Sequence, residues 1–169
     1  TGCYMLAGDI NATVTKNWNN GEGFAPIGTG VGGSYFQGKL EGLSYTIEGL
    51  FIHRPTIQFV GLFGYVKDAG ASVENLSLVG GRVTGKLFVG GVVGFSEGAV
   101  QLKGLRNANA IAGDSYVGGI VGYMRNGSLW NAYNSGKISG TNSGNNGDIG
   151  GIAGSASDFT ILTNVANAG

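Results

Sequence analysis

The chain has 169 residues, of which 42% are hydrophobic and 12% are charged, and its 10 basic side chains balance its 10 acidic ones. This length and hydrophobic content suffice for a folded core, while the sparse, balanced charge argues against binding to nucleic acid. Glycine is extreme at 35 residues, but there are only 2 prolines and no strict Gly-X-Y period, which excludes collagen. No apolar run approaches the ~20 residues that cross a bilayer, so we expect no membrane insertion.

Residues 1–58 predict leader coils made of short strands and interrupted by one projecting loop. Strand-like segments cover residues 4–10, 36–40 and 45–52, and a polar excursion covers 13–23. Trp18 lies on this excursion, where it could either contact a ligand or fold back over the open end of the core. Cys3 is the single cysteine and cannot form an intrachain disulfide, so we interpret it as a small buried thiol.

Residues 59–169 contain a Gly-apolar-apolar-Gly phrase four times, and its copies begin 28 to 32 residues apart, the last in a truncated repeat. Such a period predicts a solenoid in which each unit contacts only its neighbours. We expect the glycines of the phrase to stack where a side chain would clash or where the backbone bends sharply. They are Gly61, Gly64, Gly91, Gly94, Gly119, Gly122, Gly151 and Gly154.

Each repeat predicts three strands. The first ends in the glycine phrase, the second follows a polar turn, and the third is short; apolar spacing typical of a helix is nearly absent. Three strands per coil of 28 to 32 residues predict an all-β parallel β-helix, a single segment spanning residues 1–169. The second strands are expected near 72–78, 100–105, 128–133 and 160–165, and the third segments at 81–85, 110–113 and 136–140.

Asparagines occupy equivalent places in successive repeats. Asn131 and Asn164 form one such set, and Asn107, Asn134 and Asn167 form another. Stacked side-chain amides can hydrogen-bond along the rod, so we expect both sets to be structural.

Aromatic residues follow three of the glycine phrases, at Tyr65, Phe95 and Tyr123, and the fourth phrase has Ser155 instead. Such a column is explained by core or corner packing, and the alternative is a platform for sugar rings or partner side chains. With Trp18, these three residues are the candidates for ligand binding. Trp130 is a weaker candidate because it lies inside a predicted strand.

Catalytic groups are not clustered in the sequence. The acids are dispersed, although Asp68, Glu97 and Asp158 could align, and polysaccharide-cleaving enzymes need paired carboxylates. Ser96 fits a G-x-S-x-G pattern, but the only histidine, His53, precedes it and no helix follows. We therefore predict no enzyme activity, no cofactor and no metal site.

The phrases at 60–65 and 116–123, and the leader segment 23–28 after Trp18, resemble the GLUG-repeat regions of filamentous-haemagglutinin-like bacterial adhesins. The resemblance covers nearly the whole chain. It implies a right-handed β-helix within a secreted or cell-surface protein, and it brings no catalytic residues with it.

The sequence therefore predicts a non-enzymatic extracellular adhesin segment that presents a surface to a host or neighbouring-cell protein, matrix or glycan. The alternative is a filament subunit whose ends stack head to tail on identical protomers; a polysaccharide-degrading β-helix is less favoured. We expect a larger parent chain or end-to-end assembly, and binding through aromatic stacking rather than salt-sensitive ion pairs. Three sequons, at Asn11, Asn75 and Asn126, permit glycan attachment.

Overall fold

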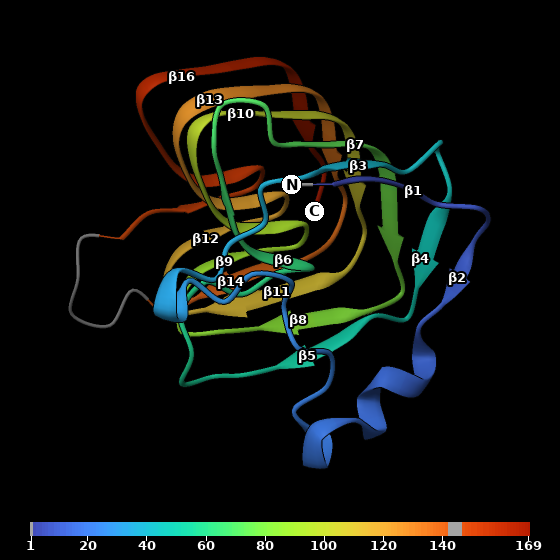
Figure 1. The fold of residues 1–169 in the computed structure, drawn as a ribbon. Helices are drawn as coiled ribbons and strands as arrows, with labels where there is room; N and C mark the ends of the chain where they lie inside the picture. Colours follow the sequence, from blue (N-terminus) through green and yellow to red (C-terminus); the bar gives the residue numbers. More distant parts are fainter. Residues whose placement is uncertain (1, 142–146) are drawn as a thin grey trace.

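The computed structural model describes residues 2–141 and 147–169. Its coils stack into a β-solenoid of about four turns, and Figure 1 shows the loops of β10, β13 and β16 nested behind one another. All pairings between named strands are parallel. The described residues contain no α-helix, only short 3-10 turns. The predicted all-β parallel β-helix is confirmed.

The largest sheet, sheet A, holds the longest strands. Its main order is β1-β3-β7-β10-β13-β16, with β2 beside β4, β4 also beside β7, and β6 beside β10. Burial alternates along these strands because successive side chains point to opposite faces of the sheet. The face that points into the stack is apolar. The strands are β1 (Cys3–Met5), β2 (Ile10–Asn11), β3 (Lys39–Glu41), β4 (Thr46–Glu48), β6 (Phe63–Lys67), β7 (Ser72–Val79), β10 (Val93–Asn107), β13 (Val121–Asn134) and β16 (Ala153–Asn167).

Two smaller sheets complete each coil. Sheet B has the order β14-β11-β8-β5 and sheet C the order β15-β12-β9. Sheet B contains β5 (Phe51–His53), β8 (Arg82–Thr84), β11 (Ala110–Gly113) and β14 (Ile138–Gly140), close to the third segments expected from the sequence. Sheet C contains β9 (Leu87–Gly90), β12 (Ser115–Gly118) and β15 (Ile149–Gly150).

The glycine phrase lies differently from the prediction. We expected it to end a strand, whereas the phrase that begins at Gly91 spans the turn from β9 into β10. The polar turn expected between the phrase and the second strand is part of one continuous strand in β10 and in β13, with a register irregularity at that place. In the preceding coil, β6 and β7 remain separate strands.

The second glycines of the phrases lie where the backbone of sheet A passes close to that of sheet C. A Cβ added at Gly94 would lie 2.6 Å from the amide nitrogen of Val60 and 2.7 Å from the carbonyl oxygen of Phe88. One added at Gly122 would lie 2.5 Å from the nitrogen of Val89. Backbone contacts this short leave no room for a side chain, so the two layers touch directly.

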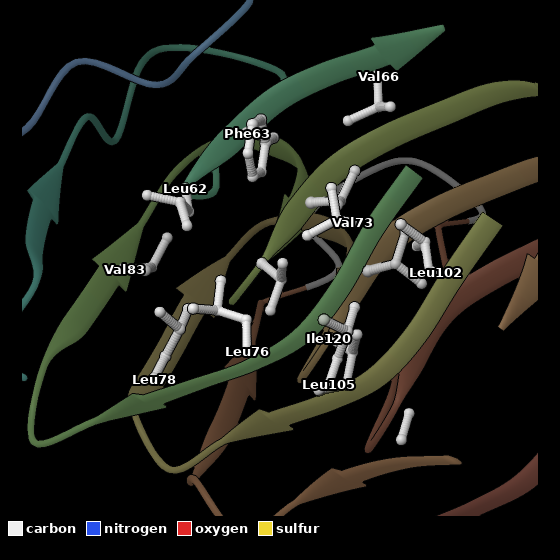
Figure 2. Close-up of a cluster of buried hydrophobic side chains, with 14 of the residues drawn as sticks. Leu62, Phe63, Val66, Val73, Leu76, Leu78, Val83, Leu102, Leu105 and Ile120 are labelled. Carbon is white, nitrogen blue, oxygen red and sulfur yellow. The ribbon is translucent and has the colours of Figure 1, made fainter. Parts of the chain in front are cut away.

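Aliphatic columns fill the interior of the stack. Val73, Leu102 and Leu129 are in register on successive coils, and all three are fully buried. Figure 2 shows Val73 and Leu102 among the other buried side chains that line the inner face of sheet A. Leu162 continues this column on β16, where 41% of the residue is exposed because β16 is the last strand of the sheet.

Both predicted asparagine columns are confirmed. The Asn107 amide donates to Oδ1 of Asn134 at 2.8 Å, and the Asn134 amide donates to Oδ1 of Asn167 at 2.7 Å. Asn164 donates to Oδ1 of Asn131 at 2.7 Å on the outside of the stack. The inner column is buried at its first two members, and the glycines that begin three of the phrases pack against it: Gly91, Gly119 and Gly151.

The leader supplies one edge of sheet A and three short 3-10 turns: η1 (Thr13–Asn17), η2 (Asn19–Gly21) and η3 (Val31–Gly33). Figure 1 shows η1 and η2 as the blue turns projecting below β5 and β2, where the polar excursion was predicted. The expectation of a buried Cys3 is wrong. Cys3 is exposed because it lies on β1, the edge strand of sheet A, which has a neighbour on one side only.

Candidate binding surface

Two columns of aromatic rings run side by side along one edge of the stack. One lies at the start of the sheet A segments and the other follows sheet C, so a coil contributes a ring to each. The Phe88 and Tyr116 centroids are 4.9 Å apart, and those of Phe95 and Tyr123 are 5.4 Å apart. The columns consist of Tyr65, Phe95 and Tyr123, and of Phe59, Phe88 and Tyr116.

The second column was missed by the sequence interpretation. Phe59, Phe88 and Tyr116 have φ values of 61°, 55° and 54°, in the left-handed region that bulky side chains rarely adopt. Strain of this kind persists only where the surrounding packing enforces it. The recurring tripeptide aromatic-Val-Gly, which starts at each of these residues, is the signal that could have revealed the column.

The rings of the two columns pack mainly on one another. All six are half-buried, and each contacts rings in its own column and in the neighbouring one. A sugar that stacks on an aromatic residue needs a free ring face. Packing therefore accounts for Tyr65, Phe95 and Tyr123, and ligand binding by them stays a prediction.

A charged cluster borders the aromatic columns at Glu97. Its carboxylate accepts a hydrogen bond from the Tyr65 hydroxyl, forms an ion pair with Arg125 and lies 3.4 Å from Nζ of Lys67. Burial raises the pKa of the Tyr65 phenol; the Arg125 guanidinium opposes this shift, and the Tyr35 side chain adds to it. The phenol thus stays protonated at neutral pH and serves as a donor. These contacts occupy the Glu97 carboxylate within the structure.

Trp18 lines an apolar cavity of about 580 Å³ at the leader end of the stack. The cavity is also lined by Phe24, Phe36 and Leu62, and the rings of Trp18 and Phe24 lie 6.4 Å apart. Trp18 is 47% exposed. It therefore borders the open end of the core, as one of its two interpretations predicted.

Trp130 and Tyr133 lie on either side of a corner in sheet A. Asn131 between them has a φ of 54°, and Asn75 at the equivalent place on β7 has a φ of 52°. Figure 1 shows β7 turning from the upper edge of the stack down its right side. Trp130 is half-buried and Tyr133 is 37% exposed. Among the described residues, neither ring contacts another aromatic ring or a cation. These two rings, unlike those of the columns, have faces free of such partners.

Sequence reasoning ranked Trp130 low and missed Tyr133. In a regular strand, positions three apart point to opposite faces, so the two could not share an outer surface. The left-handed conformation of Asn131 interrupts this alternation, so that Trp130 and Tyr133 both lie on the outside of the stack. Its equivalence with Asn164, already visible in the sequence, was the available signal, since asparagine tolerates this conformation.

The possible catalytic groups are dispersed in the structure as well. Ser96 is fully buried within β10, and His53 is exposed on β5 in another sheet. Glu97 is in register with Lys67, which precedes Asp68, so the suggested alignment of Glu97 with Asp68 does not occur. Within residues 2–141 and 147–169, no three histidine, cysteine or acidic side chains converge on a possible metal position.

The three sequons differ in their surroundings. Oδ1 of Asn11 accepts hydrogen bonds from the backbone nitrogen and the hydroxyl of Thr13, at 3.0 and 2.6 Å. The Asn75 amide is held by the Glu41 carboxylate at 3.1 Å. Asn126 is exposed at a φ of 57°. Oδ1 of Asn11 and the side-chain nitrogen of Asn75 thus already have partners within the chain.

The chain is similar to halomucin. It shares 40% identity with this protein of Haloquadratum walsbyi over 103 residues, covering 58% of the chain but 1% of halomucin. It also shares 34% identity over 100 residues with a Gly-rich membrane protein of Evansella cellulosilytica, covering 57% of the chain and 11% of that protein. No family model and no solved structure matches the chain. The similarity thus reaches only a small part of either relative.

In the described residues, no helix is both long and apolar enough to span a membrane.

Proposed function

We propose that this chain is a non-enzymatic segment of a larger surface or extracellular protein, and that it acts as an adhesive scaffold. The similarity to short parts of halomucin and of a Gly-rich membrane protein is the observation that carries the proposal. A stack of near-equivalent coils supports it, because a solenoid offers a long, rigid surface that can be placed away from a cell. The resemblance to GLUG-repeat adhesins agrees with this role.

The chemistry of the side chains also supports a scaffold. The amides of the inner asparagine column bond to one another, the ring columns stack, and Glu97 is held by three side chains. Groups used in this way stabilise the stack and are poorly placed to cleave a substrate, since a general acid or base needs contact with the reacting bond.

The experiment is adhesion of the purified chain, coupled to beads, to a panel of cells, matrix proteins and glycans. Binding that saturates and is lost on unfolding supports an adhesive scaffold. Trp18→Ala and Tyr123→Ala test the two aromatic surfaces, and each should weaken binding by about 1 kcal/mol or more if its surface is used. A folded chain that binds nothing in the panel would contradict adhesion and leave a passive spacer.

The alternative function, a head-to-tail filament, has one observation in its favour and one against. β16 leaves Phe159 86% exposed and Ile161 56% exposed at the edge of sheet A, which a second copy could cover. Continuing the coil register onto a second copy, however, would place Ile10 over Asn167. An aliphatic side chain cannot accept a hydrogen bond, so the amide column would be broken at that junction.

Light scattering of the isolated chain separates these functions. Growth into rods with increasing concentration would favour the filament, and a monomer at all concentrations would favour the scaffold segment.

A further inference from the structure

We propose that the corner of sheet A around Trp130 and Tyr133 binds an acidic polysaccharide, of the polyuronate class. This inference rests on the proposed adhesive function and names the class of ligand and the residues that hold it. The corner surface is defined by Lys103, Arg106, Trp130, Asn131 and Tyr133.

Among the described residues, no other aromatic ring and no cation packs on the ring of Trp130 or Tyr133. The pyranose ring of a sugar packs its C–H groups on an aromatic face, and this contact needs a ring that no other group covers. Trp130 is in register with Thr163 on the following coil, and Tyr133 is in register with Ala166. Small side chains there leave space beside both rings, whereas a large side chain occupies the equivalent place along most of the aromatic columns.

Two cations lie next to the rings on the preceding coil. Lys103 is in register with Trp130, and Arg106 is in register with Tyr133, each on the preceding coil. Both cations are exposed, and neither forms an ion pair or a side-chain hydrogen bond among the described residues. Glu74 is in register with Lys103 on its other side but lies beyond ion-pair distance.

The coil spacing brings each cation close to its ring, because neighbouring coils are ~4.8 Å apart. A uronate residue carries its carboxylate at the edge of the pyranose ring, which suits a cation beside the stacking surface rather than over it. The Arg106 guanidinium can engage a carboxylate with two parallel hydrogen bonds. At the corner itself, the exposed amides of Asn131 and Asn164 offer donors and acceptors to sugar hydroxyls.

The cations favour an acidic chain over a neutral one, because a carboxylate forms charge-assisted hydrogen bonds with them that are stronger than those of a hydroxyl. A protein partner is less suited, since the five residues that define the corner surface include no aliphatic side chain to bury. The overall charge of zero predicted binding that is insensitive to salt. The corner is an exception because it carries two unpaired cations. Its affinity for an acidic ligand should fall as the salt concentration rises, but should not vanish.

Polygalacturonate oligosaccharides are the probe, and the same oligosaccharides with their carboxyl groups reduced are the matched neutral control. The chain has 2 tryptophans, so Trp18→Phe leaves Trp130 as the sole indole reporter. In this variant we expect a saturable change in tryptophan fluorescence with the acidic oligosaccharide. Trp130→Phe, which retains Trp18, should show no such change, and its circular dichroism establishes that it remains folded.

Titration calorimetry then tests the cations. Lys103→Gln and Arg106→Gln should each raise Kd roughly fivefold or more. Lys137→Gln, which removes an exposed cation just beyond β13, should leave Kd unchanged. Equal binding of the reduced and acidic oligosaccharides would overturn the acidic class. Absence of binding, or binding that survives loss of Trp130 and both cations, would overturn the site.

The two proposals fail separately. Adhesion of the bead-coupled chain that is unaffected by Trp130→Phe, Lys103→Gln and Arg106→Gln would refute this corner and leave the adhesive function intact. Polyuronate binding by the corner without any adhesion to cells or matrix would refute the adhesive function alone.

Discussion

Replacing Asn134 by alanine should strongly destabilise the stack. Its amide donates to the carbonyl oxygen of Gly136 at 2.9 Å and to Oδ1 of Asn167 at 2.7 Å. Its Oδ1 accepts from the Asn107 amide at 2.8 Å and from the Gly136 nitrogen at 3.2 Å. At about 1 kcal/mol for each hydrogen bond, with further cost for buried groups left unpaired, we expect a loss of roughly 3–5 kcal/mol. That is a large share of the ~5–15 kcal/mol typical of a domain.

Urea unfolding monitored by circular dichroism measures this loss, provided that the slope of the transition is unchanged. Asn134→Leu distinguishes lost hydrogen bonds from an empty cavity, because leucine restores the volume but not the bonds. The matched control is Asn131→Gly, which removes one exposed amide contact and keeps a residue that tolerates a φ of 54°. We expect the control to change stability by about 0.5 kcal/mol or less. A loss below about 1 kcal/mol for Asn134→Ala would refute the structural role of the buried amide column.

Three further predictions concern the glycine phrase, the phenol and the ion pairs. Gly122→Ala should cost about 3 kcal/mol in urea unfolding because its Cβ would lie 2.5 Å from the Val89 nitrogen, whereas Gly8→Ala, with nothing within 4 Å, should be close to neutral. Equal effects of the two would contradict the close contact. The pKa of Tyr65 is raised by burial, so its contribution to stability is complete below pH ~10 and is lost as pH rises through the folded pKa; Tyr65→Phe should therefore fall less in stability between pH 9 and 11. A wild-type slope equal to that of the variant would refute it. Glu97→Gln breaks two partly exposed ion pairs and should cost about 1 kcal/mol or less in the same assay, and a larger loss would show a more strongly coupled cluster.

The coil architecture could be predicted from sequence because a solenoid repeats its packing requirements. Residues that successive coils use in the same way, such as Gly94 and Gly122 or Asn107 and Asn134, recur at the coil period, and this recurrence predicts that they stack. The burial of Cys3 was predicted wrongly because the edge of a sheet exposes positions that the same residue type would bury in an inner strand. Edges depend on which strands pair, and a single chain segment does not reveal that.

The corner at Trp130 was harder to predict because one backbone angle decides which side chains share a surface. With extended geometry throughout, Trp130 and Tyr133 point to opposite faces and only one reaches solvent. The left-handed conformation of Asn131 moves both to the outside, on adjoining sides of the corner. Hydrophobic periodicity carries no information on this angle. The asparagine at the equivalent position of the next repeat, Asn164, does indicate it, because asparagine tolerates the left-handed conformation.

Repetition also separates the residues that build the stack from those that are free to bind. A residue type that recurs in one column is used by its neighbours above and below, as the aromatic rings and the inner amides are. Recognition is then expected at columns that change chemistry from coil to coil. The column Glu74, Lys103, Trp130 and Thr163 passes from acid to base to indole to hydroxyl within four coils. Such a column contributes little to stacking, so its side chains remain available to a ligand that matches their order along the rod.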